Sequence, residues 1–343
     1  MNARTRKLLD QPAAFKLVFD PRDHYINDHC LVRDDRGLWH LFYIYFPRDS
    51  RRSAGGRLEY GIGHATSPDL IHWKEVGICL REDPGAWDAD AIYAPYVHRS
   101  PKGAYVMLYC GSGDSTQRIG AATSDDLAHW EKHDRNPVIT PATTWSGWVD
   151  TGYHSCRDPH VLEIAPGRFL CYYTADLARS ASPDASPACC IAAAESSDLL
   201  RWRDLGPVCV APKNFSGPGQ VMMESPGVLF RDHDGAKSYL LHFTHRFGVS
   251  YVTSPDPLSF PGPPRLLGPY HASEIFQDPS TSSWFITSCC QRLAVLYLPN
   301  ETIPFGDVQE GLGLFLAGLT WVEGHPVVVD LARFAAAGCI RLH

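Results

Sequence analysis

Short apolar runs separated by turn-forming residues recur along the chain. Four of them are rich in aromatic and β-branched residues: LWHLFYIYF (38–46), AYVMLYCG (104–111), RFLCYYTA (168–175) and SYLLHFTH (238–245). Gly, Pro and Asp lie at their flanks, a combination typical of β-strands. Long amphipathic helical periods are nearly absent, so the pattern predicts an all-β protein.

A longer repeat groups these predicted strands into units. GIGHATSPDLIHW (61–73), RIGAATSDDLAHW (118–130) and CIAAAESSDLLRW (190–202) share the pattern Ser-x-Asp-Leu-x-x-Trp. A fourth copy, VSYVTSPDPLSF (249–260), has Phe260 in place of the tryptophan. The copies begin roughly 60 to 70 residues apart, the spacing of a propeller blade with its loops. We expect Asp and Ser of the repeat to close a turn, and Leu and Trp to pack between blades.

These observations predict one domain, a five-bladed β-propeller over residues 1–343. Its blade-like repeats end near residues 73, 130, 202 and 260, and a fifth blade occupies about 270–343. Either the C-terminal HPVVVDLARF (325–334) or the N-terminal residues would close the ring.

Composition narrows the classes of function. The 343 residues carry a net charge of −7 and are 44% hydrophobic, which favours a large core and excludes a disordered chain. No basic run indicates nucleic acid, and no apolar stretch of roughly 20 residues indicates a membrane span. The basic N-terminus has no apolar segment behind it, and the 11 cysteines lack the spacing of disulfide frameworks or zinc sites. We therefore expect a cytoplasmic protein with free thiols and a small polar substrate; the oligomeric state stays open.

Acidic residues occur at the predicted start of every blade. The five segments are YINDHCLV (25–32), WDADAIYAPYV (87–97), CRDPHVLE (156–163), MESPGVLF (223–230) and YHASEIFQ (270–277). Asp28, Asp158 and Glu224 each directly precede a predicted apolar strand. Because blades share one axis, we expect these three carboxylates to converge on an axial pocket. Glycosidic bond cleavage needs such a group: one general acid, one nucleophile or base, and further groups that steady the sugar.

Other residues of these segments are candidates for binding a sugar. Arg157 would hold Asp158 ionised, although an Arg beside an Asp is often a purely structural pair. The aromatic candidates would stack on a sugar face or pack in the core. The full set is Asn27, Trp87, Asp90, Tyr93, Arg157, His271 and Glu274. No His, Asp or Glu cluster has metal-ligand spacing, so no cofactor is predicted.

The acidic segments resemble motifs of glycoside hydrolase family 32, the β-fructofuranosidases, whose five-bladed clan includes families 43, 62 and 68. YINDHCLVRDDRGLWHLFYIYFP (25–47) is similar to the family's Asn-Asp-Pro-Asn-Gly motif, RDP (157–159) to its middle motif, and MESP (223–226) to its Glu-Cys-Pro motif. The resemblance implies a retaining furanosidase, with Asp28 as nucleophile, Asp158 as transition-state stabiliser and Glu224 as general acid/base.

The sequence departs from the family 32 motifs at several positions. His29 and Cys30 stand where the family has Pro and Asn, and Ser225 replaces its cysteine. AIYAPYV (91–97) is closer to family 43, which implies an inverting arabinofuranosidase or xylosidase with Asp28 as base, and an axial calcium near His271. The sequence also leaves open a transferase that moves the sugar to another sugar, and a propeller that binds carbohydrate without catalysis. We expect the propeller alone, without the β-sandwich usual in family 32.

Overall fold

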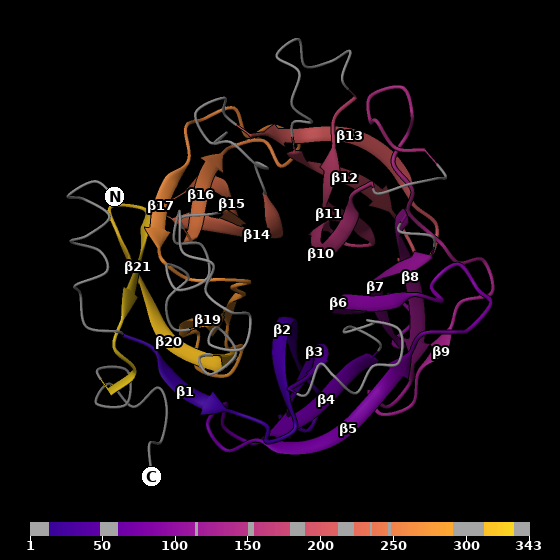
Figure 1. Ribbon diagram of the computed structural model, residues 1–343. Helices are drawn as coiled ribbons and strands as arrows, with labels where there is room; N and C mark the ends of the chain where they lie inside the picture. Colours follow the sequence, from indigo (N-terminus) through magenta and orange to yellow (C-terminus); the bar gives the residue numbers. More distant parts are fainter. Residues whose placement is uncertain are drawn as a thin grey trace, which may run out of the picture.

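Five antiparallel β-sheets surround a central axis (Figure 1). The computed structural model describes residues 14–48, 61–113, 116–149, 154–178, 189–211, 223–233, 235–245, 248–290 and 312–332. Four sheets have four strands in chain order, and the fifth has five strands. The prediction of an all-β, five-bladed propeller is confirmed.

The first four blades each run from an inner strand at the axis to an outer edge. Blade 1 comprises β2 (His24–Arg33), β3 (Trp39–Pro47), β4 (Gly61–Ser67) and β5 (Lys74–Arg81). Blade 2 comprises β6 (Ala91–Arg99), β7 (Tyr105–Gly113), β8 (Thr116–Ser124) and β9 (Glu131–Lys132). Blade 3 comprises β10 (Cys156–Ala165), β11 (Arg168–Asp176), β12 (Cys189–Ser196) and β13 (Arg203–Val210). Blade 4 comprises β14 (Glu224–His233), β15 (Ala236–His245), β16 (Gly248–Ser254) and β17 (Arg265–Gly268).

Both ends of the described chain close the ring. The fifth blade contains β18 (Ile275–Gln277), β19 (Trp284–Cys290) and β20 (Leu312–Val322). Strand β1 (Lys16–Phe19) pairs with β20 at Leu314 to Leu316, and β21 (His325–Val329) pairs with it from Gly318 to Val322. The sequence suggested one closing segment or the other, and the fold uses both.

The Ser-x-Asp-Leu-x-x-Trp repeat forms the turn between the third and fourth strands of a blade. In blade 2, the Asp126 carboxylate accepts hydrogen bonds from the backbone N–H groups of Ala128 and His129, both at 2.8 Å. Leu127 has a left-handed φ of 64° and is buried, and its carbonyl accepts a bond from the Trp130 indole. The turn prediction is confirmed.

The core lies between neighbouring blades. Trp130 of blade 2 packs edge-on against Phe42 of blade 1, with ring centroids 5.4 Å apart. Phe42 belongs to a buried cluster that also contains Leu127 and Cys30, and Trp130 is partly buried against it. Each turn of the repeat thus delivers apolar side chains into the gap between two sheets, as predicted.

The cysteines of the described ranges are all free thiols, and all but Cys79 are buried. This agrees with the sequence prediction of free thiols. Within these ranges, no helix has the length and apolar character needed to cross a bilayer.

The turn geometry predicts that Asp126→Ala lowers the free energy of unfolding by about 1 to 2 kcal/mol, because two backbone N–H groups lose their acceptor. Urea denaturation measures this. Asp125→Ala is the matched control, since Asp125 is exposed in the same turn. Equal stability of the two variants would contradict the structural role of the repeat.

Candidate active site

The inner strand of each blade carries a β-bulge at the same point. Register shifts place it within β2, β6, β10 and β14. Blade 5 has the same irregularity. The Thr287 N–H bonds to the Glu274 carbonyl and the Cys289 N–H bonds to the His271 carbonyl, so the segment before β18 has one more residue between its bonds than β19 has. The bulged pairs are Asn27–Asp28, Ala94–Pro95, Asp158–Pro159, Ser225–Pro226 and Ala272–Ser273. Bulges re-aim side chains and are common beside active sites.

The backbone at these bulges is strained. The angle φ is 48° at Ala94, 58° at Asp158, 50° at Ser225 and 46° at Ala272. A residue other than glycine adopts this conformation at a cost on the order of 1 kcal/mol or more, and such strain concentrates at functional sites. Proline follows three of the four. Proline has no N–H to donate to a strand ladder, and it is tolerated here because these positions are bulges in strands at the edge of their sheets.

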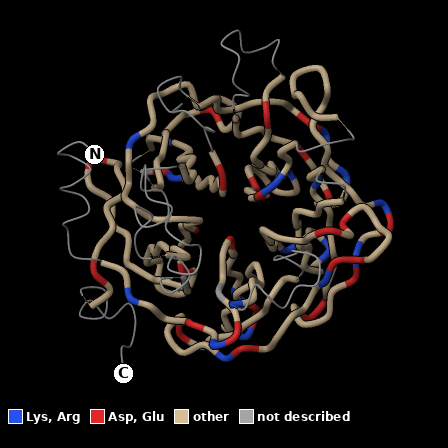
Figure 2. Tube along the Cα trace, viewed as in Figure 1, with Lys and Arg blue, Asp and Glu red and all other residues tan. Residues whose placement is uncertain are grey.

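The bulges correct one sequence expectation. Asp28 and Asp158 do not precede their strands, because β2 begins at His24 and β10 at Cys156. Glu224 is the first residue of β14. Figure 2 shows acidic positions close to the axis on these innermost strands.

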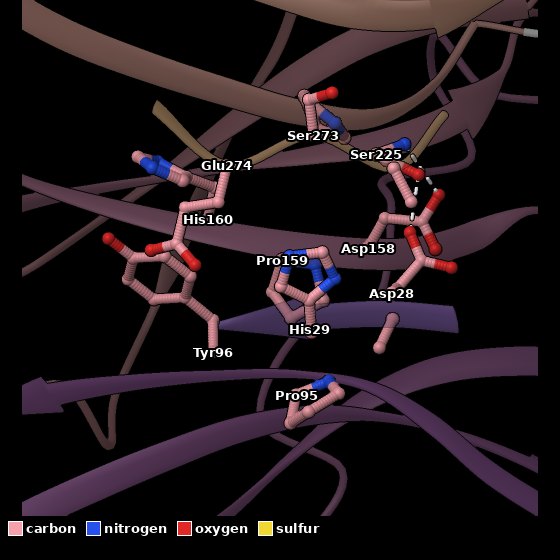
Figure 3. Close-up of a pocket in the computed structure, with 13 residues that line it drawn as sticks. Asp28, His29, Pro95, Tyr96, Asp158, Pro159, His160, Ser225, Ser273 and Glu274 are labelled. Carbon is pink, nitrogen blue, oxygen red and sulfur yellow. Dashed lines mark hydrogen bonds between the residues drawn. The ribbon is translucent and has the colours of Figure 1, made fainter. Parts of the chain in front are cut away.

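Ser225 and Arg157 join the three carboxylates into one network. The Ser225 hydroxyl donates a hydrogen bond to Asp28, and its backbone N–H donates to Asp158 at 3.0 Å (Figure 3). The Arg157 guanidinium lies 3.3 Å from the Asp158 carboxylate and 3.5 Å from that of Glu224. Residues of three different blades therefore meet at the axis, as the sequence predicted for Asp28, Asp158 and Glu224.

Burial dominates the electrostatics of this network. It raises the pKa of Glu224 to about 7 and that of Asp158 to about 6, while the Arg157 charge opposes both shifts. Burial also raises the pKa of Asp28; the nearby His271 and the Ser225 hydroxyl act against that rise. Each carboxylate raises the pKa of another, so the group holds a proton near neutral pH.

A cavity along the axis continues from the carboxylates to a second polar group. Asp28, Asp158 and Ser225 lie on one side of it, and Tyr96, His160 and Glu274 on the other (Figure 3). Glu274 is buried and accepts a hydrogen bond from the Leu31 N–H at 2.8 Å. Burial raises its pKa to about 8, so it is largely protonated at neutral pH.

The structure places two further candidates beside Asp28. The Asn27 side-chain oxygen accepts a bond from the Cys289 thiol at 3.2 Å. His271 directly precedes the bulge of its blade, the same position that Arg157 and Glu224 occupy in theirs. Its Nδ1 atom is buried and has no hydrogen-bond partner among the described residues.

Of the sequence-predicted residues, Asp28, Asp158 and Glu274 line this cavity. Arg157 and Glu224 belong to the network of acids beside it, and three further candidates belong to neither the cavity lining nor that network: Trp87, Asp90 and Tyr93. Trp87 covers two glycines of blade 2: a Cβ added at Gly111 or Gly120 would lie 2.5 or 2.6 Å from its ring. Tyr93 is buried in an apolar cluster, and the backbone N–H of Asp90 bonds to the Ser112 carbonyl at 2.8 Å. Contact of these side chains with a sugar stays a prediction.

Metal ligation finds no support in the described ranges, where no three His, Cys, Asp or Glu side chains are grouped to hold an ion.

The comparison of the sequence with protein families decides the relationship. The model of the glycosyl hydrolases family 32 N-terminal domain matches residues 19–246, a region that includes Asp28, Asp158 and Glu224. The chain belongs to glycosyl hydrolase family 32.

Relatives agree with family 32 membership. β-Fructofuranosidase 1 of Zea mays is 35% identical over 130 residues, 36% of this chain and 18% of that protein. Sucrose:sucrose 1-fructosyltransferase of Festuca arundinacea is 29% identical over 129 residues, 36% of this chain and 19% of that protein. The crystal structure of fructan 1-exohydrolase IIa from Cichorium intybus superposes with a TM-score of 0.71 at 19% identity, covering 95% of this chain and 62% of that one. The chain thus spans only part of each relative's length.

Sequence reasoning missed three residues of this family 32 site. Tyr96 and His160 line the cavity, and Ser225 joins two carboxylates. The signal was present, because Ala94-Pro95-Tyr96, Asp158-Pro159-His160 and Ser225-Pro226-Gly227 repeat the same Pro at the same place in a blade. This repeat predicts that the residues flanking each proline lie at the axis, which would have identified Tyr96, His160 and Ser225.

The pKa of Glu274 predicts a pH-dependent stability. The pKa of a Glu carboxyl group is 4.5 in the unfolded chain and about 8 for Glu274 in the folded protein. The folded state therefore keeps its full stability below about pH 4.5 and loses part of it as the pH rises from there through about 8, because the unfolded chain releases the proton first. Glu274→Gln keeps an acceptor for Leu31 and removes the charge. We expect its free energy of unfolding to exceed that of the wild type by less than about 1 kcal/mol at pH 5 and by about 3 to 5 kcal/mol at pH 9.

Urea denaturation at several pH values measures this difference. Glu131→Gln, at an exposed position of β9, is the control and should follow the wild type throughout. A constant difference between Glu274→Gln and the wild type across pH would contradict the buried, protonated state of Glu274.

Proposed function

We propose that the protein cleaves a furanoside, with a β-fructofuranoside favoured, by a retaining mechanism that uses two carboxylates. Glu224 is the general acid/base, Asp28 the nucleophile and Asp158 the residue that binds sugar hydroxyls and stabilises the transition state. The observation that carries the proposal is the single network in which Ser225 and Arg157 join all three acids.

The protonation states suit these roles. With a pKa of about 7, Glu224 holds a proton at slightly acidic pH and can donate it to the leaving oxygen. Asp28 attacks the anomeric carbon and forms a glycosyl–enzyme bond, and the leaving group departs with the Glu224 proton. Glu224 then takes a proton from water, which attacks the anomeric carbon, breaks the bond to Asp28 and releases the sugar.

Arg157 and Asp158 set the charge around the reacting sugar. One guanidinium faces two carboxylates, so its charge favours the ionised form of each. Asp158 also accepts hydrogen bonds from Thr174 at 3.2 Å and from the Ser225 N–H, which leaves it ionised above about pH 6. An ionised Asp158 accepts hydrogen bonds from sugar hydroxyls and stabilises the cation that develops at the anomeric carbon.

Transfer to a sugar hydroxyl is a second outcome of the same intermediate. The 29% identity to a sucrose:sucrose fructosyltransferase favours testing it, since a hydroxyl captures a glycosyl–enzyme bond as water does. The free thiols favour a reducing compartment such as the cytoplasm, which we propose as the location.

Product analysis tests the proposal. An NMR time course on aryl β-fructofuranoside, arabinofuranoside, xyloside and sucrose should show release from a furanoside with retained anomeric configuration. Asp28→Asn and Glu224→Gln should each lower kcat at least 1,000-fold on sucrose, because each removes a covalent or proton-transfer step. Azide should restore turnover of an aryl furanoside by Glu224→Gln, since azide needs no base.

Inversion or binding without turnover would give different results. Inverted product would place the chain's mechanism with family 43, with Asp28 as the base. Binding of a sugar without turnover by the wild type would indicate a carbohydrate-binding propeller and would overturn the enzymatic proposal. Thermal unfolding of each variant, compared with the wild type, separates loss of chemistry from loss of fold.

The pKa values predict a narrow pH profile. The ratio kcat/KM should rise as the two acids Asp28 and Asp158 ionise, Asp158 near pH 6, and fall as Glu224 loses its proton near pH 7. Because the Arg157 charge lowers the pKa values of Asp158 and Glu224, Arg157→Gln should move both limbs to higher pH. Arg168→Gln, an exposed change on the same blade, should leave the limbs in place. Unmoved limbs in Arg157→Gln would contradict its electrostatic role.

A further inference from the structure

We propose that Ser225 is a positioning residue that holds the nucleophile and the transition-state stabiliser in one fixed arrangement. The inference rests on the proposed function and deepens it. Its basis is a pair of hydrogen bonds from one residue, the Ser225 hydroxyl to Asp28 of blade 1 and the Ser225 N–H to Asp158 of blade 3. A residue of blade 4 thereby fixes two acids of other blades relative to each other.

The bulge explains why Ser225 can make both contacts. It is the first bulged residue of β14, and its φ of 50° turns the N–H away from the strand ladder. Ala94 and Ala272 have the same conformation at the equivalent points of their blades, with only a methyl side chain. Among the described left-handed bulge residues, Ser225 alone carries a hydroxyl. A glycine would adopt this φ without strain, but it would have no hydroxyl. Serine at this position therefore combines a strained backbone with the hydroxyl that contacts Asp28.

The Ser225 hydroxyl acts on Asp28, the proposed nucleophile, which must be ionised to react. Burial raises the pKa of Asp28, and the charge of Glu224 adds to the rise. A donated hydrogen bond favours the ionised carboxylate, which is the nucleophilic form. Other ionisable groups that interact with Asp28 are Asp158, Glu224, His271 and Cys289. Among these neighbours, His271 also opposes the rise, and the acids and the thiol do not.

Two substitutions separate the hydroxyl from the backbone. Ser225→Ala removes the hydroxyl and keeps the strain, whereas Ser225→Gly removes the hydroxyl and relieves the strain. Both should raise the pKa of Asp28, move the acidic limb of kcat/KM to higher pH and lower kcat/KM about fivefold at pH 6. Ser225→Cys, whose thiol is a weak donor, should fall between them and the wild type.

A matched control removes a serine hydroxyl elsewhere. Ser124 is buried in the outer turn of blade 2, where its hydroxyl accepts bonds from the N–H groups of Asp126 and Leu127. The same hydroxyl donates a bond to the Asp126 carboxylate, so Ser124→Ala loses three hydrogen bonds without touching the axial carboxylates. Its pH profile should match that of the wild type even where its stability is lower.

A titration that needs no turnover distinguishes the possible failures. ¹³C NMR of Asp carboxyl carbons, with the Asp28 signal assigned from Asp28→Asn, should show a higher pKa in Ser225→Ala and Ser225→Gly than in the wild type. An inactive wild type with this shift would overturn the proposed function and support the Ser225–Asp28 contact. An active wild type whose Asp28 titration and acidic limb are unmoved in Ser225→Gly would overturn the inference alone.

Discussion

Removal of acidic side chains from water at the propeller axis is the constraint on which the rest of the structure depends. Carboxylates crowded in a low-dielectric site repel one another and lose hydration, so they persist only with donors and opposite charge nearby. Arg157 supplies the charge, and Ser225, Thr174 and the Leu31 N–H supply donors. Ser225, the Leu31 N–H and the Arg157–Glu224 pair each reach an acid from a different blade, so the acids keep these partners only when the ring is closed. Closure by β1 and β21 on β20 is therefore a condition for the site as well as for the fold.

The blades combine a shared backbone with different side chains. Every inner strand has the same bulge, and the equivalent residue before it is Ile26, Tyr93, Arg157, Glu224 or His271. The repeated geometry places these five residues at equivalent points of their blades. Arg157, Glu224 and His271 interact with the axial acids, whereas Ile26 and Tyr93 pack in apolar clusters, so side chains of different chemistry make a site from a symmetric frame. The Ser-x-Asp-Leu-x-x-Trp turns lie away from the axis and vary little, because their hydrogen bonds and packing serve each blade in the same way.

Local patterns explain how far the sequence predicted this arrangement. Strand composition and the spacing of the repeat indicate five blades, and an acid at each blade start indicates the axial group of Asp28, Asp158 and Glu224. The bulges could not be predicted in this way, since a bulge depends on the pairing register between two strands. The Ser225 contacts depend on the juxtaposition of three blades. Trp87 packs over Gly111 and Gly120 because these glycines leave room for its ring, a relation between distant segments that the residues around Trp87 do not reveal.

His29 shows how a departure from the family motif fits the same constraint. A charged imidazole beside the acids would change their balance, but burial lowers the pKa of His29 to about 4, so it is neutral near pH 7. Its Nε2 lies 2.7 Å from the Thr287 hydroxyl of blade 5, and its Nδ1 lies 3.1 Å from the Asn27 carbonyl. The substitution therefore adds a neutral link between blade 1 and blade 5 next to the closure of the ring. Histidine at position 29 removes neither an acid nor a hydrogen-bond donor of Asp28, so it gives no physical reason for loss of catalysis. The network of Asp28, Asp158 and Glu224 is intact, which favours an enzyme over a binding module.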